Sequence, residues 1–177
     1  MILFLDSEFT GLTQRGPHLI SIGLVSEDGR FEFYAELPPE TYLKQCEPWA
    51  QDNILPRLEG KHRVMQPAEL RRRLTGWIGT LGGTRFVTDA PEFDFPFLST
   101  LLDPWPTNFA RYPIRFDSQT LGTTHQALLE SYRAAYYTPS KPAHHALNDA
   151  HALRQMWLMA KPLDAFKQWR EALDRPT

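Results

Sequence analysis

The stretch ILFLDSEFTGL, residues 2 to 12, decides the fold that this sequence predicts. Its apolar run over residues 2–5 is typical of a strand buried on both faces of a sheet. Asp6 and Glu8 follow at i, i+2 spacing, so both side chains project to one side of the sheet if the extended conformation continues. Two such carboxylates repel each other unless they share a proton or a cation, and a divalent metal suits paired oxygen ligands. Taken alone, the pair also fits ordinary surface charge.

The rest of the chain predicts an α/β fold with a mixed sheet flanked by helices. Strands are expected at 19–25 and 31–37, joined by a hairpin turn at Asp28-Gly29, and at 84–88 and 114–116. In the strand at 31–37 we expect the odd-numbered residues to be buried and the even-numbered ones exposed. The segment 38–66 is expected to be rich in loops, with one short helix near 49–55. Further helices are expected at 67–81, from Asp94 to Leu101, and at 118–133, 146–157 and 163–173.

Length and composition predict a single domain over residues 1–177. A hydrophobic fraction of 42% with 23% charged residues is typical of a globular protein. The net charge of -2 excludes the broad basic field of a protein that coats nucleic acid, so any such contact is expected to be local. One cysteine, no signal-peptide pattern and no membrane-length apolar span lead us to expect a cytoplasmic protein without a membrane partner.

Three further acids are candidates for the same site as the first pair. Asp94 has helical spacing with the apolar residues that follow it, so it is expected on a buried face. Asp149 lies in the first turn of a predicted helix, where the helix dipole alone would also favour it. Asp89 ends a predicted strand and has Glu92 three residues later, which favours an N-cap in a capping box.

Three segments together resemble a known family. They are FLDSEFTGL at 4–12, FDFPFL at 93–98 and HHALNDA at 144–150. In this order they resemble the three motifs of the DEDDh 3′-to-5′ exonuclease superfamily, which has a ribonuclease H-like fold and includes oligoribonuclease, ribonuclease T and proofreading subunits of polymerases. The resemblance covers residues 1 to about 157. The chain departs from the second motif at Asp89, where the family usually has asparagine nearby, and Phe9 stands where many members have threonine.

The resemblance implies a two-metal hydrolysis of terminal phosphodiesters. Asp6, Glu8 and Asp149 would hold one Mg²⁺ or Mn²⁺, and Asp6 and Asp94 a second ion ~3.5 to 4 Å away. His144 would be the general base, because a histidine pKa of ~6.5 lies near working pH. His145 is the alternative base, but the family's spacing of four residues between histidine and aspartate favours His144.

The resemblance also implies a substrate and an assembly. Single-stranded RNA would be degraded from its 3′ end to nucleoside 5′-monophosphates. The residues that would bind this RNA are Phe9, Gly11, Leu12 and Phe93. Ordinary core packing is an equal interpretation of those four residues. The alternatives are a proofreading-type DNA exonuclease and a non-catalytic nucleic-acid-binding module. We expect a homodimer, and we interpret the arginines at 71–73 as a solvated helix surface, with phosphate contact as the alternative.

Overall fold

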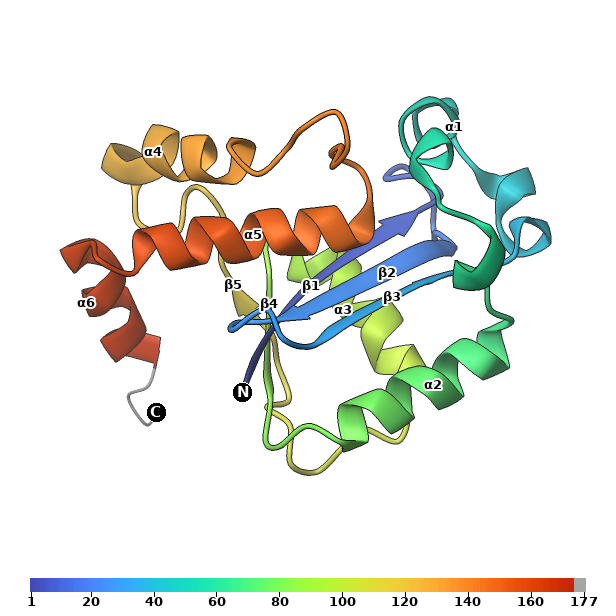
Figure 1. Cartoon of the computed structure of the whole chain (residues 1–177), viewed down its shortest axis with the longest axis horizontal. Coiled ribbons are helices and arrows are strands. Elements are labelled where there is room, and N and C mark those ends of the chain that lie inside the picture. Colours follow the sequence, from blue (N-terminus) through green and yellow to red (C-terminus); the bar gives the residue numbers. More distant parts are fainter. Residues whose placement is uncertain (174–177) are drawn as a thin grey trace.

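The computed structural model describes residues 1–173, so residues 174–177 of the predicted domain lie outside the described part. Five strands form one sheet in the order β3-β2-β1-β4-β5 (Figure 1). β1 is antiparallel to β2 and parallel to β4; β2 and β3 are antiparallel, and β4 and β5 are parallel. The predicted mixed α/β sheet is therefore confirmed. The strands are β1 Ile2–Phe9, β2 Leu19–Ser26, β3 Glu32–Glu36, β4 Arg85–Thr88 and β5 Ile114–Arg115.

Helices cover both faces of this sheet (Figure 1). They are α1 Pro48–Asn53, α2 Pro67–Gly79, α3 Pro91–Leu101, α4 Thr123–Ala134, α5 Ala146–Ala160 and α6 Asp164–Leu173, with 3₁₀ turns at Pro39–Thr41, Leu43–Gln45, Leu55–Arg57 and Lys61–Arg63. Leu3 and Leu5 of β1 pack with α2 and α3, whereas Phe4 packs with α5 and α6. Alternate residues of β1 thus face opposite cores, as the apolar run predicts.

β1 extends beyond the predicted residues 2–5 and ends at Phe9. Asp6 pairs with Gly23 of β2 and Glu8 with Ser21, so both acids lie inside the strand rather than after it. The extended conformation therefore continues through the pair, which was the condition for both carboxylates to share one side of the sheet.

The predicted alternation of buried and exposed residues in β3 is wrong. Tyr34 and Glu36 are buried, with exposures of 4% and 1%. The Glu36 carboxylate accepts hydrogen bonds from the Tyr34 hydroxyl at 2.8 Å and from the backbone N–H groups of Glu59 and Gly60 at 2.7 and 2.9 Å. The segment 55–63 therefore covers the face that the pattern assigned to solvent, and its backbone donors stabilise the buried acid.

α4 begins at Thr123, five residues after its predicted start at 118. The reason is local, because the Asp117 carboxylate accepts the N–H of Gln119 at 2.9 Å and the Thr120 hydroxyl accepts the N–H of Asp117 at 2.8 Å. Such side-chain bonds to the backbone favour a turn over a helix.

The first turn of α5 lies directly against β2. A Cβ on Gly23 would be 2.4 Å from backbone atoms of Ala146 and Leu147, so only glycine permits this approach. Because Gly23 pairs with Asp6, this contact brings the start of α5 to the acidic part of β1. Within residues 1–173, no helix has both the length and the apolar character to span a membrane.

Candidate metal centre

The nine predicted site residues all line one cavity of about 680 Å³. They come from β1 and the loop after it, from α3, and from the start of α5 with its preceding loop. The set is Asp6, Glu8, Phe9, Gly11, Leu12, Phe93, Asp94, His144 and Asp149. Segments far apart in the sequence therefore converge on a single cavity.

Two groups of ligand atoms lie within this cavity. Oxygen or nitrogen atoms of Glu8, His144 and Asp149 lie within 4.8 Å of one another. A second group with the same spacing contains Asp6, Asp89 and Asp94. Both groups are rich in hard oxygen donors, which is the ligand chemistry that Mg²⁺ and Mn²⁺ prefer.

Asp89 is not the N-cap that the sequence predicted. The N-cap residue of α3 is Ala90, and no side chain caps this helix. The Asp89 carboxylate instead accepts a hydrogen bond from Nη1 of Arg133. The position of Asp89 at the end of β4, a parallel neighbour of β1, was the available signal, since side chains that follow parallel strands meet at one edge of a sheet.

Asp94 is buried, with an exposure of 3%, as its apolar helix face predicts. Its Oδ1 accepts hydrogen bonds from the N–H of Ser7 at 3.0 Å and the hydroxyl of Ser7 at 2.5 Å. Its Oδ2 accepts the Thr88 hydroxyl. Three donors from β1 and β4 thus fix this carboxylate beside Asp6, and they favour its charged form.

The two neighbouring histidines have different surroundings. His144 has a positive φ of 62°, and its N–H donates to Oδ2 of Asp149 at 3.0 Å. Its ring lies edge-on to Trp49, with centroids 4.9 Å apart, in the wall of the cavity. Trp49 was missed because it lies in the loop-rich segment, where no sequence period marks it.

His145 is buried on the other side of this loop. It is the N-cap of α5, where its Nδ1 accepts the N–H of Asn148 at 3.4 Å. Its ring stacks on Tyr34 with centroids 4.4 Å apart, and its Nε2 lies 3.4 Å from Glu59. These contacts hold the His145 ring against Tyr34 and Glu59, and of the two histidines only His144 lines the cavity.

Burial shapes the acid–base behaviour of the cavity. Burial and then the charges of Asp149 and other neighbouring acids raise the pKa of Asp6 well above its ordinary value, and burial and Asp149 raise that of Glu8 to about 8. Burial also raises the pKa of Asp94 to about 7, against the hydrogen bonds from Ser7 and Thr88. Ionising all of these groups together therefore requires a compensating positive charge.

One buried oxygen tests whether the site fits a cation. Oδ1 of Asp149 is inaccessible to solvent and has no hydrogen-bond partner within residues 1–173. A buried acceptor without a partner is costly, and a metal ion satisfies a carboxylate oxygen in the way a hydrogen-bond donor would. Together with the oxygen-rich donor set, this orphaned atom fits a divalent ion.

The raised pKa values predict an unusual pH dependence of stability without metal. Between about pH 4 and pH 8 the folded protein retains protons on Glu8 and Asp94 that the unfolded chain has released, so the free energy of unfolding should fall as pH rises. Mg²⁺ binds the ionised carboxylates and should raise the melting temperature more at pH 8 than at pH 5. Thermal unfolding in EDTA and in Mg²⁺, at matched ionic strength, measures both effects. Equal Mg²⁺ effects at the two pH values would contradict the prediction.

Comparison with known proteins supplies a fold likeness. No protein-family model matches the chain, and no curated protein sequence does. Among solved structures, it is similar to Escherichia coli exonuclease I in a zinc-bound complex with single-stranded DNA, with a TM-score of 0.60 and 17% sequence identity. The alignment covers 97% of this chain and 42% of that one, so the chain spans less than half the length of this neighbour. The fold is thus the α/β, ribonuclease H-like fold that the motifs imply.

Proposed function

We propose that this chain is a metal-dependent 3′-to-5′ exonuclease that releases nucleoside 5′-monophosphates from single-stranded RNA. One observation carries the proposal: the four carboxylates and His144 of the three motifs meet in one cavity, where Asp149 has an orphaned buried oxygen. The fold likeness to exonuclease I, which was solved in complex with single-stranded DNA, supports a single-stranded nucleic acid as the substrate of this chain.

The resemblance to the exonuclease motifs assigns the ligands. Asp6, Glu8 and Asp149 would hold one divalent ion, and Asp6 and Asp94 the second. The structure supports this in placing ligand atoms of Glu8 near those of Asp149, and those of Asp6 near those of Asp94. Such a pair of ions, when bound, stabilises the attacking and leaving oxygens of an in-line displacement. Because Asp94 already accepts bonds from Ser7 and Thr88, it would contact its ion with a remaining lone pair or through water.

His144 would accept the proton of the attacking water. Its ring lies in the cavity wall, and its backbone is tied to Asp149 by the 3.0 Å hydrogen bond. The edge contact with Trp49 restricts the orientation of the imidazole. A base held in this way contributes about 10²- to 10⁴-fold to the rate of a hydrolysis.

An apolar wall would bind the terminal bases. Phe9 stacks on Phe93 with ring centroids 5.6 Å apart, and Leu12 and Trp49 beside them are more than half exposed, at 66% and 53%. Exposed large apolar side chains in a cavity are suited to stacking on bases without selecting a sequence. Gly11 adopts a φ of 153°, which favours glycine, and a Cβ there would also displace the Glu47 side chain. This wall favours binding of unpaired rather than duplex ends.

The preference for RNA is tested by a direct comparison. Single-stranded RNA and DNA of identical sequence, each with a 3′-hydroxyl, are incubated with Mg²⁺, and we expect the RNA to be shortened faster. If the sequence contains neither uracil nor thymine, discrimination between them has to come from the 2′-hydroxyl, since all other groups are then shared. Faster loss of DNA would replace this proposal with the proofreading-type alternative. Binding of both without hydrolysis of either would indicate the non-catalytic module.

A further inference from the structure

The two groups of ligand atoms contain a fifth carboxylate that the chemistry above does not use. Asp89 belongs to the same group of ligand atoms as Asp6 and Asp94. Its own partner is Arg133 of α4, 44 residues away in the sequence, whose Nη1 donates to Oδ2 of Asp89. Both side chains line the cavity and are mostly buried, with exposures of 20% for Asp89 and 29% for Arg133. This ion pair is therefore a built part of the site and not a surface contact.

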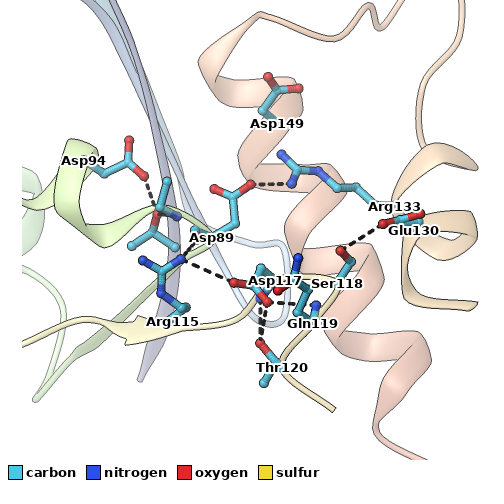
Figure 2. Close-up of polar contacts among 12 residues, drawn as sticks. Asp89, Asp94, Arg115, Asp117, Ser118, Gln119, Thr120, Glu130, Arg133 and Asp149 are labelled. Carbon is cyan, nitrogen blue, oxygen red and sulfur yellow. Dashed lines mark hydrogen bonds and ion pairs between the residues drawn. The ribbon is translucent and has the colours of Figure 1, made fainter. Parts of the chain in front are cut away.

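Arg133 also connects the two groups of ligand atoms. Its Nε lies 3.5 Å from the hydroxyl of Tyr137. Burial raises the pKa of Asp149, and the Tyr137 hydroxyl and the charge of Arg133 both oppose that rise. Figure 2 shows Arg133 extending from α4 to Asp89, with Asp149 projecting from α5 nearby. The guanidinium of Arg133 is thus hydrogen-bonded to Asp89 in one group, and its charge favours the ionised form of Asp149 in the other.

A second arginine fixes the backbone of Asp89. Nη1 of Arg115 donates to the carbonyl oxygen of Asp89 at 3.0 Å, and the same guanidinium is paired with Asp117 (Figure 2). It also forms an ion pair with Glu92. The Asp89 side chain is therefore held toward Arg133 and the other acids.

The charges of the cavity indicate what the pair does. The two groups of ligand atoms hold five carboxylates, and two divalent ions would offset four of their charges. Arg133 offsets the fifth. Glu47, a sixth carboxylate in the cavity lining, belongs to neither group and accepts hydrogen bonds from Thr13. The Asp89–Arg133 pair is thus electrically neutral, and removing either partner alone would change the charge next to the ions by one unit.

We propose that Asp89 and Arg133 are positioning residues that form a charge-balancing pair, which sets the affinity of the Asp6–Asp94 side of the cavity for a divalent ion. This inference rests on the proposed function, because it concerns the same ions. Asp89→Asn leaves the charge of Arg133 uncompensated, so it weakens binding. Arg133→Gln leaves an additional negative charge, so it tightens binding. The double variant removes both charges and restores the wild-type affinity.

The test is titration calorimetry of the full chain with Mn²⁺ alone, without substrate. We expect the single variants to shift the Kd in opposite directions, each by about tenfold, and the double variant to lie near wild type. Arg133→Lys keeps the charge and should also remain near wild type. Arg30→Gln, in the exposed pair with Asp28 on the hairpin turn, is the matched control and should have no effect.

The outcomes separate this inference from the proposed function. If the wild type binds Mn²⁺ but both single variants weaken binding, the pair has a purely structural role and the inference is wrong. The same conclusion follows if Arg133→Lys weakens binding as much as Asp89→Asn does, since charge would then not be the cause. Absence of Mn²⁺ binding by the folded wild type would overturn the proposed function, and this inference with it.

Discussion

Replacing Asp149 with asparagine should reduce the rate of hydrolysis on the order of a thousandfold while the protein remains folded. Asp149 is 6% exposed, and Oδ1 of its carboxylate has no hydrogen-bond partner within residues 1–173. An asparagine fills the same volume, and its oxygen is still able to accept the N–H of His144. It lacks the negative charge that a divalent ion requires. The loss should therefore appear in the catalytic rate and in Mn²⁺ affinity, and not in cooperative unfolding.

The matched control for this variant is Asp164→Asn. Asp164 also lies in the first turn of a helix, but it is exposed and pairs with Lys167 on α6. The Asp164→Asn variant should hydrolyse RNA at the wild-type rate. If the Asp149→Asn variant also kept the wild-type rate, Asp149 would be only a helix-terminus charge, and the metal centre would have to be assigned to other residues.

Replacing His144 with asparagine should cost about 10²- to 10⁴-fold in rate, because the attacking water loses its proton acceptor. Asparagine is the suitable replacement, since it tolerates the positive φ of 62° that His144 adopts. Folding and Mn²⁺ binding should be retained much better than hydrolysis. Single-turnover rates with Mg²⁺ at saturation measure the loss.

His145→Asn is the companion variant. Asparagine is a favoured N-cap, so the start of α5 is preserved, but the stacking on Tyr34 is lost. We expect a stability loss of roughly 1 to 3 kcal/mol and a rate within a few-fold of wild type. A larger rate loss from His145→Asn than from His144→Asn would show that the register of the third motif is wrong.

The parts of the site that the sequence predicts are those held by local structure. The orientation of Asp6 and Glu8 follows from the alternation of a single strand, and the burial of Asp94 from the apolar face of a single helix. The place of Asp149 in the first turn of α5 also follows from local sequence. Only the resemblance of the three ordered motifs implied that these acids form one site. For these residues the element that carries the side chain also determines the direction in which it points.

The parts that were missed depend on contacts between distant elements. Arg133 of α4 and Tyr137, just beyond the end of α4, reach the cavity because α4 packs beside α5, and no sequence pattern marks either residue. The burial of Glu36 depends on a loop that folds back over β3. Asp89 was predicted to cap the helix that follows it, α3, because capping rules consider only neighbouring residues. Its actual partner, Arg133, lies on α4.

The most direct test of the account is the fate of a single-stranded RNA that carries a label at its 5′ end. With Mg²⁺ we expect a ladder of labelled fragments that shorten one nucleotide at a time, because monomers leave from the 3′ end. EDTA should abolish this ladder and added Mg²⁺ or Mn²⁺ should restore it. Undiminished hydrolysis in EDTA would contradict the role of the carboxylates. Labelled mononucleotide as the first product would contradict the polarity, and internal cuts would indicate an endonuclease instead.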